Sequence, residues 1–274
     1  MQHTCKNCGN LFTGKYCNNC GEKVYTPKDK NLAHVVEEGL HFITHFEGTL
    51  FTTLKTMFTA PGKYSLDYTS GIRKKYFKPV SLFFLLVVLY LLFPLFEGLN
   101  MQLKYYESNF IFGEFIHAKV QRLLAEKHMT YDEFSEAFHH AGEKTSKFLL
   151  FLIVPVMAFV SRIILYKKKN FYFDHIIFSL EVCSFFILWG FLFLPLITII
   201  VWYIFHKQLF TKDAYSGLAI FLVFIPYLLI ATRRFFSLGW VWSIIFTLLY
   251  TFVMALFIQT LYKFILFMIS ISIV

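Results

Sequence analysis

The chain has 274 residues, of which 57% are hydrophobic, 20% aromatic and only 16% charged. With a mean hydropathy of +0.57, it is too apolar for an ordinary soluble domain, and its 36 Phe residues exclude a disordered chain. The formal charge of +9 fits a nucleic-acid partner. It fits a membrane protein equally well, because Lys and Arg then gather on cytoplasmic loops near anionic lipid headgroups. The positions of the basic residues decide between the two.

The first predicted element, over residues 1–26, is a miniature zinc ribbon built from two Cys-x-x-Cys-Gly motifs. Cys5 and Cys8 form the first pair, and Cys17 and Cys20 form the second pair. Each pair lets two thiolates converge on one ion, and the Gly that follows can adopt the positive φ of a tight turn. Four sulfurs close a tetrahedral shell, so the sequence predicts structural Zn²⁺ without a catalytic position. A redox dithiol pair or bound iron are the alternatives.

The charge of this ribbon argues against a nucleic-acid role. Lys6, Lys15 and Lys23 less Glu22 give +2, and Zn²⁺ with four thiolates contributes about −2, so the ribbon is nearly neutral. The fifth cysteine, Cys183, lies inside an apolar run. No cleaved secretory signal is expected, and a disulfide framework would need an oxidising compartment. The four clustered cysteines therefore indicate a metal site.

Residues 27–79 form the second predicted segment, a cytoplasmic amphipathic helix followed by basic residues next to the membrane. Apolar side chains of residues 31–58 share one face at about 100° per residue, which suits a helix lying at the membrane surface. Opposite them is a stripe of four polar side chains, namely His34, Glu38, His41 and His45. We expect this stripe to be the solvated face of the helix, and a second divalent-ion site is the alternative.

Five apolar runs in a transmembrane domain over residues 80–274 are long enough to cross about 30 Å of hydrocarbon. They cover residues 80–96, 148–166, 176–205, 218–231 and 239–262. The third run should tilt or kink at Pro195. The tail, residues 264–274, is too short to span again and is expected to lie at the interface or to extend the last helix. The predicted fold class is an all-α membrane protein with about five transmembrane helices.

Basic residues predict the orientation of these spans. They cluster before the first run at Arg73, Lys74, Lys75 and Lys78, after the second at Lys167 to Lys169, and after the fourth at Arg233 and Arg234. The positive-inside rule therefore predicts a cytoplasmic N-terminus and an outer C-terminus, with the first cluster touching lipid headgroups. The loop over residues 97–147 then lies outside, and its apolar spacing predicts helix.

Three polar residues near the start of the third run are candidates for intramembrane function. Glu181 is embedded in the apolar run, Asp174 lies seven residues earlier on the same helical face, and His175 stands beside it. Ionisable groups within hydrocarbon are expensive and therefore count as functional candidates. A proton or cation path through these residues is one hypothesis. A structural pairing of Glu181 with a basic residue of another span is the alternative, and the sequence favours it.

The chain resembles a bacterial family of uncharacterised membrane proteins, a domain of unknown function with an N-terminal double Cys-x-x-Cys-Gly ribbon. The resemblance rests on the four ribbon cysteines, on Thr49, Leu50, Leu54, Pro61 and Gly62, on Gly71, Arg73, Tyr76 and Pro79, and on the stretch from Tyr172 to His175. The family favours Glu-His where this chain has Asp174-His175. The resemblance implies the architecture and supplies no activity.

The first functional hypothesis is a non-enzymatic inner-membrane protein whose ribbon docks a cytoplasmic protein partner or a regulatory contact. The second is a small transporter or channel, as a monomer or a homo-oligomer, that uses Asp174, His175 and Glu181. Nucleic acid is not an expected partner, whereas membrane lipids with anionic headgroups are. An enzyme is the least supported class, because no nucleophile elbow, phosphate-binding glycine loop or dinucleotide fingerprint is visible.

Overall fold

A computed structural model describes most of the chain as two compact units, Met1–Thr49 and Leu50–Val274. The described residues are 2–5, 8–21, 24, 48–93, 100–169, 171–206 and 213–274. Residues 48–59 are helical, which agrees with the last part of the predicted amphipathic helix. The polar stripe of His34, Glu38, His41 and His45 lies outside the described residues.

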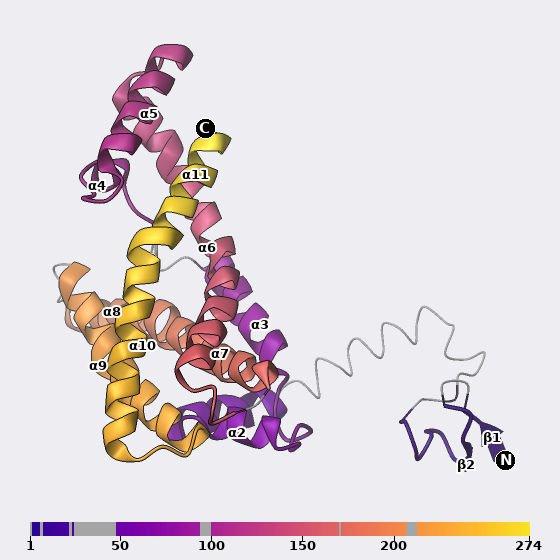
Figure 1. The fold of residues 1–274 in the computed structure, drawn as a ribbon. Helices are drawn as coiled ribbons and strands as arrows, with labels where there is room; N and C mark the ends of the chain where they lie inside the picture. Colours follow the sequence, from indigo (N-terminus) through magenta and orange to yellow (C-terminus); the bar gives the residue numbers. More distant parts are fainter. Residues whose placement is uncertain are drawn as a thin grey trace. The chain divides into compact units, whose positions relative to one another are not determined.

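The N-terminal unit contains a short antiparallel hairpin, drawn in indigo in Figure 1. Strand β1 (Gln2–Thr4) pairs with β2 (Leu11–Thr13), and His3 stands opposite Phe12. Phe12 is buried against Cys5 and Cys17, with Val24 packed beside them. So small a core cannot stabilise a fold by itself, because its buried apolar area is far below what offsets chain entropy.

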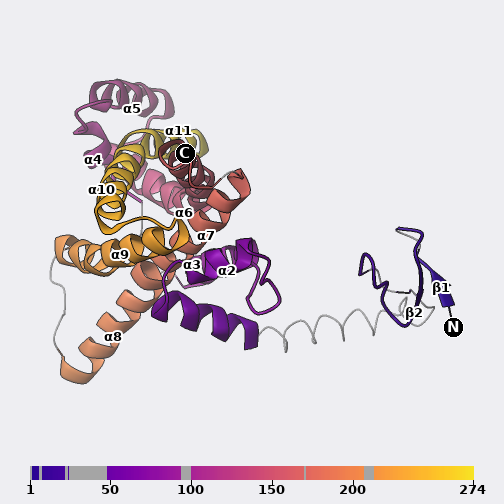
Figure 2. The same cartoon turned by 60° about the horizontal axis from the view of Figure 1, so that its bottom comes forward.

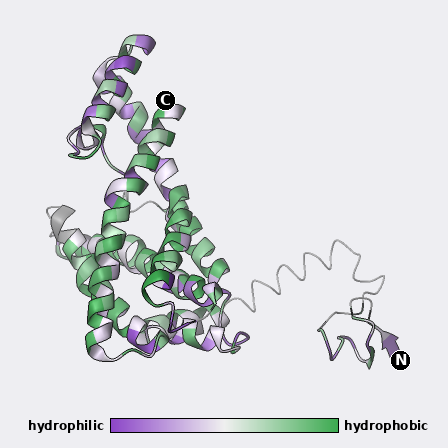
Figure 3. Cartoon of the chain, in the orientation of Figure 1, coloured by the Kyte–Doolittle hydropathy of each residue, from purple (hydrophilic) through white to green (hydrophobic). Residues whose placement is uncertain are grey.

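The second unit is all-helical, as predicted, and four of its described helices are long and apolar enough to cross a membrane. They are α6 (Tyr131–Ile164), the continuous helix α7–η2–α8 (Tyr172–Phe205), the apolar part of α9 (Gly217–Phe235 of Asp213–Phe235), and the continuous helix α10–η3–α11 (Trp240–Ile273). Their lengths match the predicted second to fifth runs or exceed them. Apolar residues dominate the middle of this unit in Figure 3, whereas polar residues gather at its ends.

The first predicted span is shorter than expected in the described residues. Helix α3 (Pro79–Leu92) has 14 residues, which at 1.5 Å per residue covers about 21 Å and falls short of a 30 Å hydrocarbon core. Helix α3 begins at Pro79. Proline is favourable at the first helical position, because the N–H that it lacks would have no hydrogen-bond partner within the helix. Residues 94–99, which the predicted run partly includes, lie outside the described residues.

A change of helical pitch accompanies Pro195 in the second long helix. The helix α7 (Tyr172–Phe186) passes into a π-helical segment, η2 (Ile187–Phe193), and then into α8 (Leu194–Phe205). Pro195 cannot donate a hydrogen bond, and its ring would collide with the carbonyl one turn earlier in a regular α-helix. The wider π turns before it relieve that collision. The sequence predicted a tilt or kink at Pro195 and did not predict the π-helical segment.

The predicted outer segment packs against the end of the chain. Helices α4 (Leu103–Glu107) and α5 (Gly113–Lys127) lie beside the start of α6 and the end of α11 (Lys263–Ile273) in Figure 1. Their shared core includes Tyr106, Ile116, Phe138 and Phe267. The predicted boundary at residue 147 falls inside α6, which runs on without a break. The tail over residues 264–274 extends the last helix.

Three basic connections lie together at the opposite end of this unit. They are the loop before α3, the α6–α7 connection and the α9–α10 connection (Figures 1 and 2). The Arg73 guanidinium lies 5.7 Å from the Phe173 ring centre, and the Lys169 ammonium lies 4.8 Å from the Phe235 ring centre. Arg73, Lys74, Lys75 and Lys78 are all exposed. Basic residues far apart in sequence therefore share one end of the helical unit.

Candidate functional site

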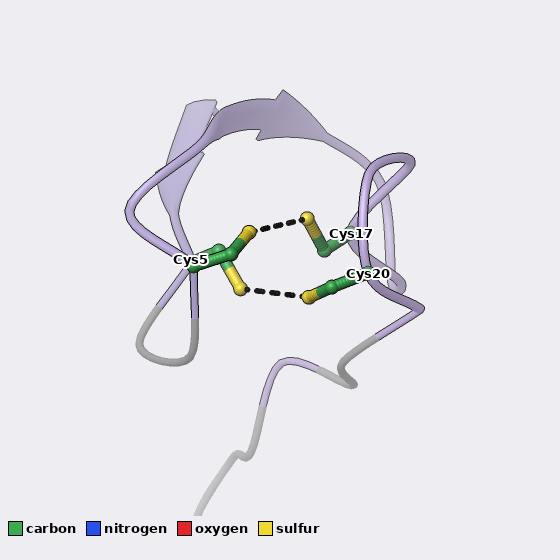
Figure 4. A group of neighbouring side chains, drawn as sticks. Cys5, Cys17 and Cys20 are labelled. Carbon is green, nitrogen blue, oxygen red and sulfur yellow. Dashed lines mark hydrogen bonds between the residues drawn. The ribbon is translucent and has the colours of Figure 1, made fainter.

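The structure brings all four motif cysteines together, and Figure 4 labels Cys5, Cys17 and Cys20 among them. Their sulfur atoms lie within 4.8 Å of one another, with 3.4 Å between Cys5 and Cys20 and 3.6 Å between Cys8 and Cys17. Four sulfurs held 2.3 Å from one zinc ion stand about 3.8 Å apart, because they occupy the corners of a tetrahedron. The donor set therefore fits a tetrahedral ion that prefers thiolates.

Two similar turns present these cysteines. The Gly9 amide donates to the Cys5 carbonyl at 2.9 Å, and the Gly21 amide donates to the Cys17 carbonyl at 2.8 Å. Both glycines have positive φ, 72° and 79°, which side chains with a Cβ adopt only at a steric cost. Each turn folds its two sulfurs towards the same point, as the sequence pattern predicted.

Nearby donors favour the thiolate forms that a metal requires. Amide donation from Asn10 lowers the pKa of the Cys8 thiol. Burial raises the pKa of the Cys17 thiol, but amide hydrogen bonds from Cys20 and Asn19 outweigh it and lower that pKa to about 6. Thiolates, and not thiols, bind metal ions, so this electrostatic environment matches the sulfur geometry.

A second polar centre, built around Glu181, lies in the helical unit. This fully buried carboxyl group accepts hydrogen bonds from the Gly62 amide at 2.8 Å, the Ser65 amide at 2.8 Å, the Ser65 hydroxyl and the Tyr227 hydroxyl at 3.1 Å. Gly62 and Ser65 belong to the first turn of α2 (Lys63–Thr69). The amides of a helix N-terminus lack partners within their own helix and carry a partial positive charge, which a carboxylate satisfies.

This contact ties three helices together at the basic end of the unit. Glu181 is on α7, Tyr227 is on α9, and α2 packs against both helices. Arg234 of α9 adds a hydrogen bond to the Pro61 carbonyl directly before α2. The expected pairing of Glu181 with a basic residue is not found in the described part of the chain. Its partners there are amides and hydroxyls, because the free N-terminus of α2 supplies the positive potential instead.

Gly62 explains how the start of α2 can lie so close to the backbone of α9. Its φ of +76° lies in the left-handed region, and a Cβ built on it would stand 2.4 Å from the Ala231 carbonyl oxygen of α9. No side chain fits there. A glycine is therefore required both for the turn and for the contact between α2 and α9.

A Gly62→Ala variant should unfold about 2–4 kcal/mol more easily than the wild-type protein, because left-handed strain and overlap with Ala231 add together. Denaturation by SDS in mixed micelles would measure this loss. The matched control is Gly71→Ala, since Gly71 also has positive φ but nothing lies within 4 Å of its built Cβ. Equal losses in the two variants would mean that the close approach to α9 contributes nothing.

His175 and Asp174 do not join Glu181 in one cluster. The buried His175 ring contacts the Ser161 hydroxyl at 3.0 Å through Nδ1 and approaches the Lys169 carbonyl at 3.5 Å through Nε2. Asp174 lies in the first turn of α7 and is partly exposed. The residues of the hypothetical proton or cation path therefore lie in separate surroundings, and the Glu181 carboxyl group already accepts four hydrogen bonds.

Sequence reasoning identified Glu181 but missed Ser65 and Tyr227. Both lie far from it along the chain, and a serine or tyrosine beside an apolar stretch carries no signal of its own. The pair Pro61-Gly62 was a visible cue, since it marks a turn just before a helix. That cue was not used in the sequence analysis, and it would not have indicated the partner of the helix.

The fold and the site together define a class: a helical protein with four helices able to cross a membrane and an N-terminal four-cysteine cluster able to hold a metal ion. The model of a family described as "Protein of unknown function (DUF3667)" matches residues 47–91. This stretch includes Gly62, Ser65 and all of helix α3 except Leu92. No curated protein and no solved structure matches the chain.

Proposed function

We propose that this protein is a multi-pass protein of the bacterial inner membrane whose N-terminal ribbon holds structural Zn²⁺ and docks a cytoplasmic protein. The observation that carries the proposal is the closed cysteine cluster. Its four ligand atoms already complete a tetrahedral shell, which leaves no open position for a substrate or water. A closed site of this kind stabilises a small surface module and supplies no chemistry of its own.

The surface of the ribbon supports a docking role. Phe12 turns inward against the cysteines, whereas Leu11 and Tyr16 are 61% and 60% exposed. Exposed tyrosine and leucine on so small a module are suited to bury against a partner, because tyrosine is enriched among the residues that dominate binding and buried leucine adds apolar area. These two side chains are therefore proposed as the contact residues.

The orientation of the helical unit follows from its basic end. Arg73, Lys74, Lys75 and Lys78 lie with the other basic connections at one end of the unit, and this favours the cytoplasmic face with its anionic headgroups. The end formed by α4, α5 and α11 then faces outward. We favour docking over transport because the four donors around Glu181 satisfy its carboxyl group and give it a structural role.

A photoreactive phenylalanine analogue at Tyr16 should capture one cytoplasmic protein reproducibly in native membranes. Capture should disappear in a second variant that adds Leu11→Asp, since a buried unpaired charge opposes binding. The zinc content of that variant should stay unchanged. Mass spectrometry of the crosslinked products checks both outcomes.

The matched control places the same analogue at Tyr105, which is 55% exposed on α4 and faces outward in this proposal. It should capture no cytoplasmic protein. Docking is wrong if Tyr16 captures nothing or if Leu11→Asp leaves its capture intact. Capture of the same protein at Tyr105 would overturn the orientation.

A further inference from the structure

An apolar cavity lies among the membrane-spanning helices. Its volume is about 110 Å³, and it is lined by side chains of α3, α6, α7, α9 and α10, among them Met157, Cys183, Phe186, Phe221, Met254 and Ala255. The polar exception is Thr251, since the hydroxyl of Tyr250 is engaged by the Met157 carbonyl at 3.2 Å. The Thr251 hydroxyl is buried without a hydrogen-bond partner among the described residues, and the rest of the wall is apolar, so the cavity suits a hydrocarbon chain.

Distances along the helices place this cavity inside the hydrocarbon core that α9 and α10 are long enough to cross. Tyr250 is ten residues from the start of α10 at Trp240, and Leu228 is seven residues from the end of α9 at Phe235. At 1.5 Å per residue these separations are about 15 Å and 10 Å, within a hydrocarbon core of about 30 Å. Lipid headgroups do not reach this level, but acyl chains do.

The cavity is open towards lipid. Phe221 is 44% exposed and Ala255 is exposed, while Met157, Cys183 and Met254 at the inner wall are buried. Its volume is smaller than the roughly 150 Å³ of an engineered apolar cavity that binds benzene. It therefore suits the end of a chain whose remainder lies outside, rather than a compact molecule.

We propose that this cavity binds the end of one acyl chain of a membrane phospholipid. Within hydrocarbon the driving force is van der Waals contact, because a void among side chains forfeits dispersion energy that an inserted chain restores. The bound acyl chain would contact α6, α7, α9 and α10 and fill the space between them. The site is independent of the ribbon and of the docking role.

Photolabelling in nanodiscs of phosphatidylcholine and phosphatidylglycerol tests the proposal. The probe is a phosphatidylcholine with a diazirine near the end of one acyl chain, and peptide mass spectrometry locates its products. Wild-type protein should be labelled at Phe186 and Met254 about threefold or more above Leu248, which is 62% exposed on the lipid-facing side of α10. A probe with its diazirine beside the ester should lose this preference.

An Ala255→Trp variant fills the mouth of the cavity and should reduce labelling at Phe186 and Met254 to the level of Leu248. The matched control is Leu256→Trp, because Leu256 is the next residue, is 54% exposed and does not line the cavity. It should leave the labelling unchanged. Thermal unfolding of both variants verifies the fold.

Uniform labelling of wild-type protein over the cavity and the lipid face would overturn the proposal without any variant. Unchanged labelling in folded Ala255→Trp protein would do the same. Suppression by an isoprenoid quinone at concentrations where added phospholipid has no effect would assign the cavity to a different lipid.

Discussion

A Cys17→Ser variant should retain no tightly bound zinc, whereas wild-type protein should contain one ion per chain. Replacing one of four thiolates opens the shell, and a hydroxyl is a poor substitute for a thiolate ligand. Zinc in such modules contributes about 10–16 kcal/mol of binding free energy, which is also their folding free energy. Among the described residues of the ribbon, Phe12 is the main buried side chain besides the cysteines, so zinc should supply most of its folding free energy.

Elemental analysis of protein purified under reducing conditions gives the stoichiometry, and limited proteolysis reports the folding of residues 1–26. Cys183→Ser is the matched control, because Cys183 is buried in α7 and lies outside the cluster. It should bind as much zinc as wild-type protein. Iron in place of zinc, or a metal-free wild type with oxidised cysteines, would support the alternatives of an iron site or a redox dithiol.

Loss of zinc should leave the helical unit intact. Residues 50–274 form a compact unit of their own, with buried aromatic residues such as Tyr90, Phe178 and Tyr250. Its unfolding in detergent should therefore be the same in Cys17→Ser protein, in chelator-treated protein and in wild-type protein.

Local patterns in the sequence were sufficient for the cysteine cluster and for most spans. The spacing of Cys5, Cys8, Cys17 and Cys20 already dictates where their sulfurs meet, because each pair shares one short turn. Long apolar runs likewise predict helices within hydrocarbon. The continuity of α6 across residue 147 was less visible, since its polar first half follows ordinary helix chemistry, with a capping box of Thr130 and Glu133 at its start.

The hydrogen-bond partners of Glu181 could not be predicted without the tertiary structure. Glu181 and Ser65 are 116 residues apart, and their contact depends on how α2 packs against α7 and α9. A buried acid in an apolar run predicts a partner but not its identity, because a charge, an amide or a hydroxyl can each satisfy it. The sequence favoured a basic side chain, and the structure provides a helix N-terminus.

Replacing Glu181 by Ala should lower the free energy of unfolding by about 3–5 kcal/mol. The substitution leaves the amides of Gly62 and Ser65 and the hydroxyl of Tyr227 buried without an acceptor, and each such donor costs about 1–3 kcal/mol. Denaturation by SDS of the purified helical protein measures the change. Tyr227→Phe is the mild control, since the Gly62 amide remains on Oε1 and the expected loss is about 1 kcal/mol.

Glu181→Gln separates a structural role from transport. Its amide group has one oxygen and one NH₂, so the NH₂ must face the backbone amide of either Gly62 or Ser65. A backbone amide can only donate, so one pair of donors would face each other without an acceptor. A structural site therefore predicts that Gln is destabilising even though its shape is nearly unchanged. A transport site predicts instead that Gln abolishes proton or cation flux in liposomes while the protein stays stable. Full stability of both Gln and Ala variants would contradict the carboxyl group's role in joining α2 to α7 and α9.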